Sequence, residues 1–281
     1  MTWNDLTSDE QGFYQWFYEK KCNIWERGCC PIVSEQCDTA QREAPMFYPE
    51  PISGQPRQQN IFFLAINPNQ GRDKDDRVFC WNSEDNRGET VEDYANRYLQ
   101  WYNDPNWPGH VNDHVTGGAL GILLARNGQP VPDNFVVLPE FDEAQAAELR
   151  NVVTLNLAHC KCRDFAKHFM QKHNYERQRT FKSKCGQKTL QAILLWRPKV
   201  VVCFGKPVLW WLQELEKSGW VLDENSARAR NIPVGHVGTL TGQYRGQDVA
   251  LNLVFSPHPS RNQLEGGGGA AVVEGLRTVL G

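Results

Sequence analysis

Four short apolar runs recur along the chain and predict buried strands, at residues 61–66, 151–158, 199–204 and 250–255. The first run, at 61–66, is continuous and rich in β-branched and aromatic residues, which is typical of a strand covered on both faces. Stretches with helical spacing separate the runs, at 90–102, 117–125, 186–196, 206–215 and 270–280. We therefore expect a three-layer α/β/α fold with a central, mostly parallel, four-stranded sheet.

The residues before the first strand have a different character. A helical segment is expected near the N-terminus, and four prolines follow it between Pro45 and Pro56. This proline-rich stretch is typical of an extended linker. The sequence thus predicts a helical, cysteine-containing segment at 1–58 that packs on an α/β domain at 59–281.

Three of the four strands end in conspicuous polar residues. Asn67 precedes Pro68, which cannot donate a ladder hydrogen bond and so ends the first strand. Asn156 and His258 stand at the ends of two other strands. Ligands of open α/β sheets bind beyond the carboxyl ends of the strands, which makes these residues candidates for a site. Each also has a structural interpretation, as a turn former, a strand cap or a packed loop residue.

The net charge and the hydrophobic pattern of the chain bear on which partners it can have. The chain has 281 residues and a net charge of -3, so no broad basic field indicates a nucleic-acid partner, although a local basic stripe is compatible with this charge. No apolar run approaches the roughly 20 residues that span a bilayer, and the N-terminus does not resemble a signal peptide. We expect a cytoplasmic protein without a membrane partner.

Nine cysteines are more informative in that compartment, because disulfides rarely form there. The alternatives are buried thiols and metal ligands. Cys80 and Cys203 lie in apolar surroundings and are interpreted as unreactive core thiols.

Several motifs resemble the uracil-DNA glycosylase superfamily. Residues 65–69, Ala-Ile-Asn-Pro-Asn, are similar to its Gly-x-Asn-Pro-Gly loop, and the step from Pro68 to Phe79 is similar to that of the iron–sulfur families. Residues 197–205 resemble the Pro-Lys-Val strand of those families, and residues 258–262, His-Pro-Ser-Arg-Asn, resemble the last loop of the single-strand-selective monofunctional enzymes. The resemblance extends over residues 59–280.

The resemblance implies a uracil-DNA glycosylase-like fold and a monofunctional glycosylase of base-excision repair, a hydrolase of N-glycosidic bonds. It would remove uracil or a related deaminated base from DNA. Asn67 would position the attacking water, and His258 would stabilise negative charge on the departing base. Ile66, Phe79 and Asn156 would bind the base.

The resemblance also implies a DNA partner, single- or double-stranded, bound by a monomer that associates with the nucleoid during repair. The DNA-binding residues would be Pro68, Lys206, Ser260 and Arg261, with Arg261 entering the base stack. An ordinary solvated arginine is the alternative for that position.

The iron–sulfur families further imply a set of four cysteine ligands. The positions in this chain are Cys30, Cys37, Cys160 and Cys185, with Cys29 and Cys162 as reserves. Four thiolates suit a 4Fe-4S cluster, and zinc is the alternative. No organic cofactor is expected.

Two other function classes stay open. One is a catalytically silent nucleic-acid-binding protein with the glycosylase fold, which Ala65 and Asn69 favour because they replace motif glycines. The retained Asn67, Asn156 and His258 oppose it. The other is a hydrolase of small nucleotides or nucleosides, which the acidic net charge would suit.

Overall fold

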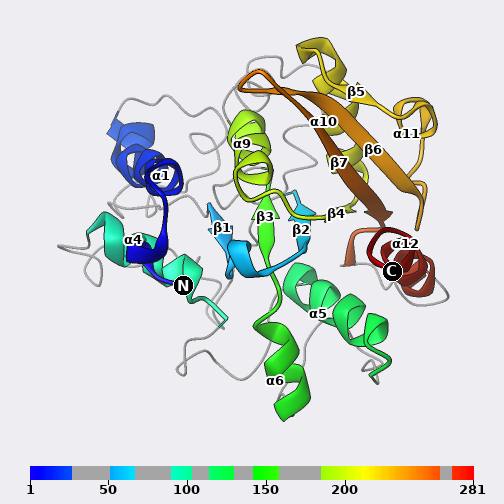
Figure 1. Cartoon of the computed structure of the whole chain (residues 1–281), viewed down its shortest axis with the longest axis horizontal. Helices are drawn as coiled ribbons and strands as arrows, with labels where there is room; N and C mark the ends of the chain where they lie inside the picture. Colours follow the sequence, from blue (N-terminus) through cyan, green and yellow to red (C-terminus); the bar gives the residue numbers. More distant parts are fainter. Residues whose placement is uncertain (27–50, 67–89, 103–113, 130–141, 158–184, 260–267) are drawn as a thin grey trace. The chain divides into compact units, whose positions relative to one another are not determined.

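The computed structural model covers the whole chain and describes residues 1–26, 51–66, 90–102, 114–129, 142–157, 185–259 and 268–281 (Figure 1). These residues fall into two compact units. The first unit comprises Met1–Ile52, Asn67–Gln100 and Asn156–Leu195; the second comprises Ser53–Ile66, Trp101–Leu155 and Trp196–Gly281. The boundary expected between residues 58 and 59 stays a prediction.

A mixed sheet of seven strands confirms the α/β class, but the expected number of four strands is wrong. The strand order is β1-β3-β2-β4-β7-β6-β5. The four expected strands are present as the neighbours β3-β2-β4-β7, and β4 pairs in parallel with both β2 and β7. The bounds are β1 Ile52–Ser53, β2 Ile61–Ala65, β3 Thr154–Asn156, β4 Val200–Phe204, β5 Val221–Leu222, β6 Val237–Tyr244 and β7 Gln247–Ser256.

The three additional strands have no continuous apolar run. β1 and β5 are two residues long, which is too short for a periodic signal. β6 contains two glycines and polar residues, and it pairs antiparallel with both β7 and β5. The turn from β6 to β7 uses Arg245 and Gly246, with φ angles of 52° and 76°. Two consecutive positive φ angles are typical of a tight hairpin turn.

One face of the sheet in the second unit packs on α5 (His114–Arg126) and α12 (Gly268–Leu280) (Figure 1). Phe63 of β2 and Phe204 of β4 stack on this face, with ring centroids 5.8 Å apart. The intervening residues Phe62 and Val201, which point to the other face, are also buried. Burial on both faces explains why these strands are continuous apolar runs.

The second unit also contains α10 and several shorter helices. α10 extends over Lys206–Leu215 and places Val208, Leu209 and Leu212 in buried positions. The others are η2 Pro56–Gln58, α6 Glu143–Leu149, η4 Glu216–Ser218 and α11 Glu224–Arg228.

In the first unit, aromatic side chains join α1 (Ser8–Glu26) to α4 (Val91–Leu99). The Tyr18 and Tyr94 rings lie 5.9 Å apart, and Tyr94 and Tyr98 of α4 are fully buried. Thr90 begins α4 with a capping box that includes Asp93. The unit also contains η1 (Trp3–Asp5) and most of α9 (Gly186–Trp196). No helix in the described ranges is long and apolar enough to cross a membrane.

Asp223 connects α11 to β6 in the second unit. Its Oδ1 accepts a hydrogen bond from the Ser226 amide at 3.1 Å, and its Oδ2 accepts one from the Thr239 amide at 3.1 Å. His236 Nε2 lies 3.3 Å from Oδ1. Burial, the largest influence, raises the pKa of Asp223, but the hydrogen bonds from Ser226, His236 and Thr239 together lower it below its ordinary value of 3.8.

We expect Asp223→Asn to lower the free energy of unfolding at pH 7 by about 1–2 kcal/mol, because the amide keeps one acceptor oxygen and replaces the other with an NH2 group that cannot accept from the Ser226 or the Thr239 amide. The folded-state pKa is lowered, so the carboxylate stabilises the fold above its unfolded-state pKa near 4. That stabilisation disappears as the pH falls through the folded-state pKa. Urea unfolding at pH 7 and pH 3 should therefore show a smaller difference between variant and wild type at pH 3.

Asp248→Asn is the matched control, because Asp248 is an exposed carboxylate on β7 that accepts a bond from the Gln243 side chain at 3.2 Å. It should change the unfolding free energy little at either pH. Equal effects of Asp223→Asn at pH 7 and pH 3 would contradict the role assigned to the Asp223 carboxylate.

Candidate functional site

The carboxyl ends of β4 and β7 are joined by main-chain contacts. Phe204 pairs with Ser256, and the Gly205 amide donates a hydrogen bond to the Ser256 carbonyl at 2.9 Å. Gly205 has φ 85° and ψ 162°, a conformation that is essentially restricted to glycine. This glycine lets the chain turn directly from β4 into α10.

His258 lies against that turn. A Cβ atom added to Gly205 would be 3.4 Å from His258 Cβ and 3.7 Å from His258 Cδ2. His258 is half-buried, whereas the flanking Pro257 and Pro259 are buried. The histidine is thus held beside the N-terminus of α10, where the helix dipole produces a positive potential.

Lys206 is the first residue of α10, and Pro207 follows it. Its Nζ lies 5.2 Å from the centre of the Trp210 ring, so the aromatic face supports the ammonium group. Gly205, the N-cap residue, has no side chain to bond the first amides of the helix. Pro207 has no amide hydrogen and the Val208 amide donates to the Gly205 carbonyl at 3.2 Å, so the Lys206 ammonium and the helix dipole are the features here that would attract an anion.

Asn156, the last residue of β3, belongs to the first unit and is only 9% exposed. Its carbonyl oxygen accepts a hydrogen bond from Thr189 Oγ1 at 3.0 Å. Its side-chain amide makes no hydrogen bond among the residues that the structure describes.

The cysteines in the described ranges differ in their surroundings. Cys185 is half-buried directly before α9, and its carbonyl accepts from Thr189 Oγ1 at 3.1 Å. Cys203 is fully buried in β4, and burial raises the pKa of its thiol, as expected for an unreactive core cysteine. Within these ranges, no three His, Cys, Asp or Glu side chains gather as a metal site.

Comparison with known families and curated proteins assigns no relative to the chain. No family model matches it, and no curated protein matches it significantly.

The described residues cover the predicted site in part. In the second unit they bring together Lys206 and His258, with Ile66 half-buried directly after β2. In the first unit they connect Asn156 with Cys185 through Thr189. The other predicted positions lie outside the described residues: Asn67, Pro68, Phe79, Ser260, Arg261, Cys30, Cys37, Cys160 and the reserves Cys29 and Cys162, as does Cys80.

Two contributors, Gly205 and Thr189, are absent from the sequence-based prediction of the site. A glycine directly after a buried strand and before Lys206-Pro207 is a signal that would have found the first. Thr189 carries no such signal, because it is one polar residue in an otherwise ordinary helix.

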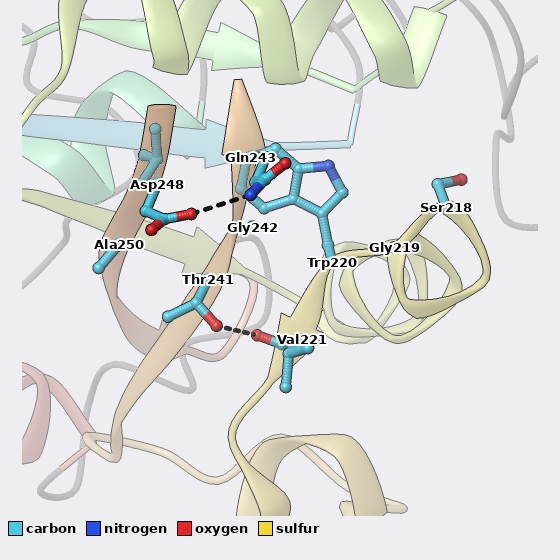
Figure 2. Close-up of a pocket in the computed structure, with 10 residues that line it drawn as sticks. Ser218, Gly219, Trp220, Val221, Thr241, Gly242, Gln243, Asp248 and Ala250 are labelled. Atoms are coloured by element: carbon cyan, nitrogen blue, oxygen red, sulfur yellow. Dashed lines mark hydrogen bonds between the residues drawn. The ribbon is translucent and has the colours of Figure 1, made fainter. Parts of the chain in front are cut away.

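A surface pocket of about 640 Å³ lies elsewhere in the second unit (Figure 2). The Trp220 indole packs on Gly242 of β6, and Gln243 donates to Asp248 across the hairpin. Residues 248–250 of the lining are at the start of β7, whereas His258 follows its end. The length of β7 separates this pocket from the candidate site.

We expect Gly205→Ala to lower the free energy of unfolding by roughly 1–3 kcal/mol, because alanine is strained in this conformation. The added Cβ would lie in van der Waals contact with His258, 3.4 Å from its Cβ and 3.7 Å from its Cδ2, so the ring resonances of that histidine should shift in NMR spectra. Gly219→Ala is the matched control, since Gly219 has the same φ of 85° and no atom within 4 Å of an added Cβ. Unchanged His258 resonances in Gly205→Ala would contradict the contact.

Proposed function

We propose that this protein is a monofunctional DNA glycosylase with a uracil-DNA glycosylase-like fold, which hydrolyses the bond between deoxyribose and uracil or a related deaminated base. The observation that supports it best is the placement of His258 beside Gly205 at the N-terminus of α10. The order of the motifs around residues 65–69, 156 and 258–262 agrees with this activity.

His258 acts on the leaving group in this proposal. Cleavage of the glycosidic bond leaves positive charge on the sugar and negative charge on the base. A histidine fixed between two buried prolines can donate a hydrogen bond to the base oxygen as that charge develops. The positive end of α10 stabilises the same charge. Asn67 holds the attacking water through its side-chain carbonyl.

Asn156 recognises the base. Its amide offers one acceptor and one donor group, which match the N3–H and O4 of uracil. Cytosine presents the opposite pattern at those two positions, so the pair would reject it. No described residue hydrogen-bonds this side-chain amide, which is compatible with the role. Ile66 and Phe79 contact the base from the side and from its face.

DNA is held by its phosphates and by the base stack. Lys206 at the start of α10 contacts one phosphate, with Pro68 and Ser260 contacting others. Arg261 fills the space that the extruded base leaves in the stack. A local anion site of this kind is compatible with the net charge of -3.

The proposed protein also binds a metal group through cysteine thiolates. Cys185 is half-buried at the beginning of α9, so its thiol suits ligation better than the fully buried Cys203 does. With Cys30, Cys37 and Cys160 it supplies a thiolate set that suits a 4Fe-4S cluster, or zinc. The group has a structural role and supplies no chemistry to base release.

We expect His258→Ala to slow single-turnover release of uracil from a DNA oligonucleotide by roughly 10²–10³-fold, the usual cost of losing such a donor. Affinity for the oligonucleotide should change little, because this bond strengthens only in the transition state. Asn67→Ala should act in the same way. His236→Ala is the control, since His236 stacks on Phe255 and contacts Asp223 on another part of the second unit.

Release of base by wild type from deoxyuridine as fast as from DNA would favour a small-molecule hydrolase. Tight DNA binding without release would favour the silent binding protein. Unchanged rates for both His258→Ala and Asn67→Ala in an active enzyme would overturn the mechanism.

We expect Asn156→Asp to slow uracil release and to permit release of cytosine, because a carboxylate repels uracil O4 and accepts from the cytosine amino group. Asn252→Asp is the control, because Asn252 bonds the Lys199 carbonyl at the amino end of β4. Competition between oligonucleotides containing uracil and cytosine measures the change. Retained preference for uracil in Asn156→Asp would exclude Asn156 as the residue that distinguishes the bases.

We expect protein purified without oxygen to contain about four iron atoms and to absorb broadly near 400 nm. Cys185→Ser should lower both the iron content and the yield of soluble protein, because metal binding is coupled to folding. Cys203→Ser is the control and should retain the iron. A content of one zinc atom and no iron would show that the site binds zinc and not a cluster. Full metal content in Cys185→Ser would show that Cys185 is not a ligand.

A further inference from the structure

Thr189 connects two segments of the first unit through one hydroxyl group. It is fully buried on α9, and its Oγ1 lies 3.0 Å from the Asn156 carbonyl oxygen and 3.1 Å from the Cys185 carbonyl oxygen. A hydroxyl group has a single hydrogen, so it donates to one carbonyl at a time or is shared between them. Both partners are main-chain atoms of residues that belong to the proposed site.

The two hydrogen bonds of Thr189 differ in the distance that they bridge along the sequence. The bond to Cys185 joins positions four apart, which is the local bond that threonines commonly make within a helix. The bond to Asn156 joins positions 33 apart in the sequence. It holds the end of β3 against the first turn of α9, and helix formation alone does not require it.

The bond to Asn156 determines how the amide side chain is presented. β3 ends at Asn156, so the sheet holds the residue on its N-terminal side only. Thr189 fixes the carbonyl on the other side, and the two restraints together define the direction of the Cα–Cβ bond. The bond from Thr189 therefore restrains the main chain from which the Asn156 side-chain amide projects.

We propose that Thr189 is a positioning residue that aligns Asn156 with the base. The inference rests on the proposed function, because it assigns the effect of Thr189 to the base that Asn156 recognises. Errors of about 1 Å in such an alignment cost about 10²-fold in rate. Thr189 itself acts through Asn156 and does not contact the substrate.

The test removes the hydroxyl group at nearly constant volume. Thr189→Val should slow single-turnover release of uracil by about 10- to 10²-fold, with DNA affinity within a factor of two of wild type. Thr189→Ser keeps the hydroxyl and should restore most of the rate. Thr278→Val is the matched control, because Thr278 Oγ1 makes the same four-residue helix bond, to the Glu274 carbonyl at 3.0 Å, on α12.

A double variant distinguishes positioning from general stabilisation. If Thr189 acts through Asn156, adding Thr189→Val to Asn156→Ala should cause no further loss of rate. Multiplication of the two losses would show that Thr189 acts elsewhere and would overturn the inference. Equal losses in Thr189→Val and Thr189→Ser would overturn it too, because volume and not the hydroxyl would then be responsible.

The remaining outcomes separate this inference from the proposed function. Wild type that releases no base overturns both. An active wild type together with a Thr189→Val variant of equal rate overturns the positioning role alone. If Thr189→Val does not fold, Thr189→Ala, which has no donor, takes its place, and a wild-type rate in that variant overturns the inference.

Discussion

The parallel pairing of β4 with both β2 and β7 is the constraint on which the candidate site in the second unit depends. Strands that run in the same direction end at the same edge, so Ile66, Gly205 and Pro257 leave the sheet together. The pairing is secured by burial of both faces, which contributes about 1.5–3 kcal/mol for each large apolar side chain. The polar residues that follow the strands are therefore presented by a rigid base.

The turn after β4 holds His258 in a defined position relative to the sheet. A residue with a Cβ would be strained at Gly205, because its φ of 85° and ψ of 162° suit glycine alone, so the glycine permits the direct turn from β4 into α10 beside His258. The bond from the Gly205 amide to the Ser256 carbonyl fixes β7 at its last residue, two positions before the histidine. The position of His258 thus depends on main-chain groups as well as on side chains.

The sequence was sufficient to predict the parts of the fold that lie in largely apolar stretches. β2 and β4 are apolar throughout, β3 and β7 lie in the largely apolar stretches 151–158 and 250–255, and the helices α5, α9, α10 and α12 lie where helical spacing predicts them. β6 was missed because its pattern depends on its neighbours: Gly238 packs against Asp223 and Gly242 against Trp220. A glycine selected by a side chain from another element leaves no periodic signal in its own segment.

The same distinction applies to the candidate site. His258 and Asn156 are predicted because each is a polar residue at the end of a largely apolar run, which is a local property of the sequence. Gly205 and Thr189 act on them through backbone conformation and through a contact between residues 33 positions apart, and neither is visible in a local pattern. In a site at strand ends, the polar residues proposed to contact the ligand can therefore be predicted from a local pattern, because their chemical type is visible in the sequence. The residues that position them cannot be predicted in this way, because their role depends on contacts with distant segments.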